Sequence, residues 1–198
     1  MPNFDDDKLL HDLIQGDSDA FSTLMTEYQD NVVNTCARFV YNMQDAEDVA
    51  QSVFIEVFQS VGRFQGRSQL STWIYRIAVT KSLDFLRKKT RKKRIGKVKR
   101  LFGLDSDEGQ SSIDPPDPSP SPQANLETQE QAEILRVAIS GLPENQKTAL
   151  ILTTYEQLSQ AEVSQIMGNT VSAVESLIHR AKKNLRLSLE ATFDKKLP

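Results

Sequence analysis

The sequence predicts an all-α protein with two small helical domains joined by a flexible, acidic linker rich in proline and serine. Apolar residues recur every three or four positions over long stretches, which places them on one face of a helix. A single segment, 114–122, is dominated by proline, which lacks the amide proton that a helix needs and clashes with the preceding turn. We therefore expect a first domain over 4–94, a linker over 95–125 and a second domain over 126–190.

The first domain is expected to contain four helices. A short helix follows the acidic residues 5–7, which favour a helix N-terminus, and stops at Gly16. A second helix begins at Asp17 or Ser18, a third runs from about 45 to 61, and a fourth begins near Leu70 and continues into a run of basic residues. One face of the third helix is expected to be apolar and to carry Val49, Val53, Phe54, Val57, Phe58 and Val61.

The second domain begins with a helix over 126–140, and the next helix follows Pro143, a residue suited to a first turn. The segment 158–180 then has the form of a helix-turn-helix, whose second helix lies in the major groove of DNA. Ser159 and Glu162 form a capping box, and Gly168 permits a turn with positive φ. Ser172 and Glu175 are expected to form a second capping box. An ordinary helical hairpin is the alternative interpretation.

Charge is strongly segregated although the net charge is only −3. Residues 87–100 contain ten bases and no acid, whereas 101–128 contain six acids and no base. Phosphate contacts act within roughly a Debye length of 8–10 Å, so the local charge of 87–100 matters more for phosphate binding than the net charge of the chain. The basic block therefore predicts nucleic-acid binding, despite a sequence pI near 5.5.

The remaining composition argues against several classes of protein. Cys36 is the only cysteine, and no apolar run reaches the ~18 residues of a membrane span, so we expect a cytoplasmic protein. His11, Cys36 and His179 are scattered without metal-ligand spacing. There is no glycine-rich phosphate loop and no nucleophile motif. We therefore expect no catalytic residue, no metal, no cofactor and no small-molecule substrate.

The fourth helix carries a polar face next to aromatic residues. Arg76, Thr80, Arg87 and Lys88 fall near one line at helical spacing, with Lys81 beside it. Aromatic residues beside a basic helix suit single-stranded DNA, whose bases can stack on them. Phe64 lies with Gly66 in the loop before this helix, and core packing is the alternative interpretation for Phe64, Trp73 and Tyr75.

Several motifs together resemble the sigma-70 family. Five segments resemble region 2 of that family, in the family's order and at its spacing: 45–51, 53–58, 64–66, 71–78 and 84–87. Region 4 is resembled by 141–143, 158–159, Gly168 and 179–181. The chain is too short for the additional domain of housekeeping sigma factors. It is therefore identified as a member of the compact extracytoplasmic-function class (group 4).

The resemblance implies a role for three groups of residues. Core RNA polymerase would be bound by Asp45, Glu47, Asp48, Gln51 and Glu56. The −10 promoter element would be captured and opened by Phe64, Arg67, Trp73, Arg76, Thr80, Lys81, Arg87 and Lys88. The −35 element would be read in duplex form by Thr170, Ser172, Ala173, Glu175, Ser176, His179, Arg180 and Lys183. The resemblance also implies an anti-sigma factor, often membrane-bound, as a further partner.

The chain departs from the family pattern at three of its positions. Thr80 replaces an asparagine that many relatives have, and Glu175 and Leu177 stand where lysine and arginine are frequent. Glu175 can accept a hydrogen bond from cytosine N4 or cap the helix, so the −35 preference of relatives does not transfer. Two other classes stay open on the residues alone: a helix-turn-helix regulator that works without polymerase, and a nucleic-acid enzyme using the carboxylates of 45–56.

Overall fold

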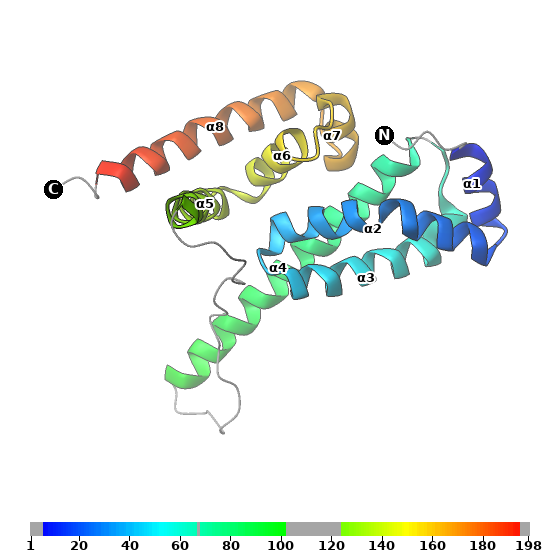
Figure 1. Ribbon diagram of the computed structural model, residues 1–198, viewed down its shortest axis with the longest axis horizontal. Helices are drawn as coiled ribbons and strands as arrows, with labels where there is room; N and C mark the ends of the chain where they lie inside the picture. The colour runs from blue at the N-terminus through cyan, green and yellow to red at the C-terminus, as the bar shows by residue number, and fades with distance from the viewer. Residues whose placement is uncertain (1–5, 67, 102–123, 195–198) are drawn as a thin grey trace. The chain divides into compact units, whose positions relative to one another are not determined.

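The computed structural model describes residues 6–66, 68–101 and 124–194 (Figure 1). These residues form eight α-helices and one short 3-10 helix, and no strand occurs among them. The chain divides into two compact units, Met1–Pro116 and Asp117–Pro198, each with its own buried apolar residues. The prediction of an all-α fold with two helical domains is confirmed.

The first unit is built on three long helices. They are α2 (Ser18–Val40), α3 (Met43–Ser60) and α4 (Leu70–Leu101), and each packs on the other two. The short helix α1 (Asp6–Ile14) and the 3-10 helix η1 (Val61–Arg63) pack against each other at one end of this bundle (Figure 1). The fully buried side chains at the centre of the bundle include Leu24, Val32, Phe39, Val53, Val57 and Ile74.

Side-chain caps set the helix boundaries of the first unit. The Asp17 carboxylate accepts hydrogen bonds from two amides in the first turn of α2. Tyr41 takes a left-handed conformation (φ 59°) that ends this helix. The Asn42 side chain then accepts from the Asp45 amide at 2.8 Å. The third helix therefore starts at Met43, slightly before the expected position, because asparagine is a strong N-cap.

The second unit consists of four helices. They are α5 (Ala124–Ser140), α6 (Glu144–Thr154), α7 (Gln160–Met167) and α8 (Val171–Asp194). Helix α8 contacts the other three, which makes it the axis of the unit. Ile139, Leu142, Leu150 and Ala181 form one buried cluster, and Val163 and Val174 are buried where α7 meets α8.

The predicted linker falls mainly on residues 102–123, which lie outside the described residues. Helix α4 continues to Leu101, because 87–101 contain a single glycine and no proline to end it. Helix α5 begins at Ala124. The exact limits of the two domains, 4–94 and 126–190, stay predictions.

Candidate functional site

The outward face of α3 carries the acidic surface expected from the sequence. Glu47, Asp48 and Gln51 are exposed, and Asp45 and Glu56 are half-buried at its border. Val49, Val53 and Val57 on the opposite side are buried in the bundle. We call the first five residues the docking surface. Such a surface is complementary to a basic partner.

Two apolar residues beside the docking surface are exposed, and one of them, Phe58, was expected to be buried. Ile55 is 57% exposed and Phe58 is 59% exposed. The sequence pattern placed Phe58 on the buried stripe of the helix. That expectation is wrong, because Phe58 lies at the edge of the stripe, where its ring meets Phe21 edge-on, with centroids 5.2 Å apart. Exposed apolar side chains next to polar ones are typical of interaction surfaces.

Two ion pairs connect α3 with α4. The Lys81 Nζ atom donates to Glu56 Oε2 at 2.9 Å, and the Lys89 Nζ atom donates to Asp45 Oδ2 at 2.7 Å. The pairs are partly exposed, so each contributes only about 0.2–1 kcal/mol. Residues that the sequence assigned to separate functions, polymerase binding for Glu56 and DNA binding for Lys81, are therefore partners of each other.

The aromatic residues Phe64 and Trp73 lie at the loop before α4 and in its first turns. Their ring centroids are 5.1 Å apart with an angle of 45° between the planes, and both side chains are half-buried. Gly66 has φ 65°, the left-handed conformation that glycine adopts without strain. Arg67, expected to contribute to the same site, lies outside the described residues.

The polar face of α4 is present as expected. Arg76, Thr80, Arg87 and Lys88 are exposed, and Lys81 is half-buried. The Thr80 hydroxyl donates to the Arg76 backbone carbonyl at 2.8 Å, so it offers an incoming base only its acceptor lone pairs. Arg87 pairs with Asp84 at 3.2 Å within the helix.

The last turns of the basic helix lie beyond Lys89, whose Nζ atom still pairs with Asp45 of α3. The C-terminal turns of α4 extend past the ends of α2 and α3 (Figure 1). All side chains from Arg87 to Ile95 are exposed. An exposed helix with cations around its circumference is suited to a phosphate backbone.

The helix-turn-helix of the second unit is confirmed. The Ser159 hydroxyl accepts from the Glu162 amide at 3.3 Å, and Glu162 Oε2 accepts from the Ser159 amide at 2.8 Å, which completes the expected capping box. Gly168 ends α7 in the left-handed region with φ 65°. Val163 and Val174 are fully buried and hold the two helices together.

Replacing Gly168 with alanine is expected to destabilise the chain by about 1–2 kcal/mol, because a Cβ atom is strained in the left-handed region. An added Cβ atom would meet no neighbour within 4 Å, so the cost comes from the backbone alone. Gly141→Ala is the matched control, since a Cβ there would make ordinary contacts. Urea unfolding of both variants measures the difference. Equal losses would show that the turn does not require a left-handed residue.

The residue that caps α8 differs from the expected one. The Thr170 hydroxyl oxygen accepts from the Ala173 amide at 3.2 Å, and the helix begins at Val171. Ser172 is therefore inside the first turn. The capping box expected at Ser172 and Glu175 is wrong, because Thr170 caps the helix two residues earlier.

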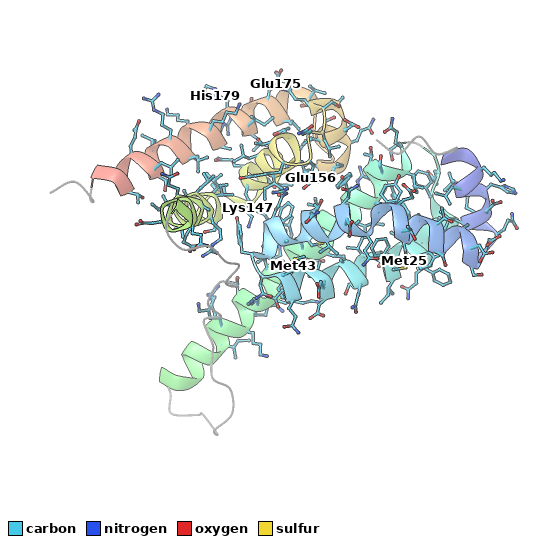
Figure 2. The ribbon with its side chains drawn as sticks, viewed as in Figure 1. Met25, Met43, Lys147, Glu156, Glu175 and His179 are labelled. Atoms are coloured by element: carbon cyan, nitrogen blue, oxygen red, sulfur yellow. The ribbon has the colours of Figure 1, made fainter. Side chains whose placement is uncertain are left out.

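The outer face of α8 gathers the residues expected at the −35 element. Ser172, Glu175, Ser176, His179, Arg180 and Lys183 are exposed, as is Thr170 before the helix, and Ala173 is half-buried. Glu175 and His179 lie on the side of α8 that faces away from α5 and α6 (Figure 2). Val174 and Ala181 on the inner face are fully buried.

One buried cation was not predicted from the sequence. Lys147 in α6 is only 7% exposed, and its burial lowers the pKa of the ammonium group, an effect that nearby Glu144 partly offsets. On α8, by contrast, the pKa of Arg186 is raised by its hydrogen bond to Glu190. Thr148 and the short continuous apolar run 149–152 follow Lys147, so no periodicity indicated that its side chain faces inward.

No group of three or more His, Cys, Asp or Glu side chains within the described residues could hold a metal ion. None of the helices among these residues has the length and apolar character that crossing a membrane requires.

Comparison with known families and proteins agrees with the geometry. Residues 24–92 match the family model for Sigma-70 region 2, and residues 132–185 match Sigma-70, region 4. The RNA polymerase sigma-H factor of Pseudomonas aeruginosa is 31% identical over 187 residues, covering 93% of this chain and 94% of the relative. The ECF RNA polymerase sigma-E factor of Haemophilus influenzae is 31% identical over 185 residues, covering 93% and 95%.

Two solved structures share the fold. CnrH, in complex with the cytosolic domain of CnrY, superposes with a TM-score of 0.65 at 22% identity, covering 94% of this chain and 97% of that chain. The sigma factor RpoE of Bartonella quintana, in complex with the anti-sigma factor NepR, gives a TM-score of 0.59 at 18% identity, covering 86% and 96%. With both regions matched in order and relatives similar over nearly their whole length, the chain belongs to the sigma-70 family of RNA polymerase sigma factors, in its extracytoplasmic-function class.

Proposed function

We propose that this chain binds core RNA polymerase and directs it to promoters through their −10 and −35 elements. The observation that carries the proposal is the presence of both modules in one chain, a region 2 match at 24–92 and a region 4 match at 132–185. The chain acts in the cytoplasm as a specificity subunit. It catalyses no reaction of its own, since RNA synthesis belongs to the polymerase.

The docking surface on α3 binds the clamp coiled coil of the largest polymerase subunit. Its acids Glu47 and Asp48 are exposed and have no ion pair within the described residues, so they are available to basic groups. Ile55 and Phe58 extend the surface with apolar area. A charged surface with adjoining apolar area provides both attraction at a distance and burial on contact.

The first unit also captures the −10 element as single-stranded DNA. Phe64, Trp73 and the loop between η1 and α4 receive bases that leave the stack, while Arg76, Thr80 and the basic turns of α4 follow the backbone. Partial exposure of both aromatic rings supports this role, because a stacking platform must pack on one side and remain open on the other.

The second unit reads the −35 element as duplex DNA. The N-terminal turns of α8, with Thr170, Ser172, Ala173, Glu175 and Ser176, face the base edges in the major groove. His179, Arg180 and Lys183 lie further along and bind phosphates, which fixes the docking position without reading sequence. The exposure of these residues on one side of α8 supports the assignment.

An anti-sigma factor holds the chain inactive until a signal releases it. CnrH and RpoE, which share this fold, were both solved with a bound protein, the cytosolic domain of CnrY and the anti-sigma factor NepR. The docking surface on α3 and the outer face of α8 both carry exposed residues that such a partner could cover. Co-purification from unstressed cells tests this: an anti-sigma factor should be recovered with the chain.

The test of the function is run-off transcription with purified core polymerase, this chain and a fragmented genomic library. Discrete transcripts that require the chain are expected, and their start sites will identify the promoter elements. If core polymerase neither binds the chain nor gains initiation from it, a helix-turn-helix regulator that works without polymerase becomes the better explanation.

The ion pair between Glu56 and Lys81 leads to a prediction about DNA binding. Replacing Glu56 with glutamine releases the Lys81 ammonium group to meet phosphates, so affinity for a single-stranded −10 oligonucleotide should rise about two- to fivefold. Glu47→Gln is the control, because it removes the same charge from an exposed acid of the same helix. Fluorescence anisotropy with the free chain measures both. An equal gain in the two variants would show that only net charge matters and that the pair does not restrain Lys81.

A further inference from the structure

We propose that Glu175 on α8 reads a cytosine in the −35 element by accepting a hydrogen bond from its N4 amino group. The inference rests on the proposed function, in which α8 enters the major groove of the −35 duplex. It assigns a base preference to Glu175, the acidic residue among those expected to face the −35 element.

The geometry at the start of α8 shows that Glu175 does not cap the helix. A carboxylate near a helix start commonly serves in a capping box, as Glu162 does with Ser159 in α7. In α8 this role is excluded, because Thr170 caps the helix and binds the Ala173 amide. Glu175 is exposed, and the described part of the chain supplies it with no ion pair. Its carboxylate is therefore free to face a ligand.

The position of Glu175 is that of a base reader. In a helix-turn-helix, the N-terminal turns of the second helix contact base edges. Glu175 lies about one turn into α8, close to Ser172 and Ser176 on the outer face. It lies on the side of α8 that faces away from the body of the unit (Figure 2). The cations Arg180 and Lys183 come later along the helix, where they offset the repulsion between the carboxylate and the phosphates.

The chemistry of a carboxylate selects one base in the major groove. An ionised carboxylate only accepts hydrogen bonds. Guanine offers two acceptors there, thymine an acceptor and a methyl group, and adenine a donor beside the acceptor N7. Cytosine alone offers a donor, its N4 amino group, without an adjacent acceptor. Glu175 therefore favours a C·G pair at the position that it faces.

The experiment is a selection of promoters by holoenzyme assembled from core polymerase and the full chain, with the −35 element randomised. The chain with Glu175 should enrich C·G at one position by about 5- to 100-fold over the other pairs. Glu175→Gln should lose this preference and gain one for A·T, because glutamine pairs with adenine N6 and N7. Glu190→Gln is the control, since it removes the same charge from α8 far from its N-terminal turns and should keep the original preference.

Two outcomes would overturn the assignment while leaving the proposed function intact. The first is an unchanged base preference in Glu175→Gln. The second is tighter binding to all sequences without a change at any position, which would mean that Glu175 acts only by repelling phosphates. If the unmodified holoenzyme selects no −35 sequence at all, the proposed function fails and the assignment fails with it. Circular dichroism checks that the exposed substitution leaves the helices intact.

Discussion

Replacing Arg87, Lys88, Arg91 and Lys92 together with glutamine is expected to weaken promoter binding by about 100-fold at physiological salt and to flatten its salt dependence. All four side chains are exposed on the C-terminal half of α4. Each cation that neutralises a phosphate releases condensed counterions, so the slope of log K against log salt should fall by roughly three to four units. Binding of holoenzyme to promoter DNA between about 50 and 200 mM salt measures the slope.

The loss should be similar for every promoter sequence, because phosphates carry no sequence information. The control exchanges the two kinds of cation at the same four positions, with Arg87→Lys, Lys88→Arg, Arg91→Lys and Lys92→Arg, which preserves all charges. It should keep nearly the original slope. A slope that stays unchanged in the glutamine variant would remove these residues from the DNA interface.

The helices were predictable because each has a local cause in the sequence. Apolar spacing, the caps at Asp17 and Ser159 and the glycine at Gly168 act within a few residues, and they define the elements of both units. The same dependence on neighbouring residues explains why the capping residue of α8 was predicted wrongly. Thr170 and Ser172 are both good caps, and the sequence alone does not decide which one takes the role.

The relations between helices were not predictable in the same way. The pairs Glu56–Lys81 and Asp45–Lys89 join residues 25 and 44 positions apart, so they depend on how α3 lies against α4. The exposure of Phe58 also depends on packing, because the helical period only places it at the edge of the buried stripe. The sequence indicated which residues form each surface, and the packing shows that the docking surface and the basic helix share contacts.

Reversing the charge of Glu47 and Asp48 together, with lysine at both positions, is expected to reduce the affinity for core polymerase by about tenfold or more. Both acids are exposed on the docking surface and have no ion pair within the described residues, so the fold should be unaffected. Like charges placed against a basic partner cost several kcal/mol. Glu56 is a poorer target, since its reversal would also bring two cations together at Lys81.

Competition for core polymerase against a labelled copy of the unmodified chain measures the effect, and thermal unfolding checks stability. The single reversals Glu47→Lys and Asp48→Lys are each compared with Asp30→Lys, which makes the same charge change at an exposed position of α2 outside the docking surface. If only the α3 variants lose affinity for core polymerase, the loss comes from the docking surface and not from the net charge of the chain. Equal affinity in all variants would place polymerase binding elsewhere on the chain.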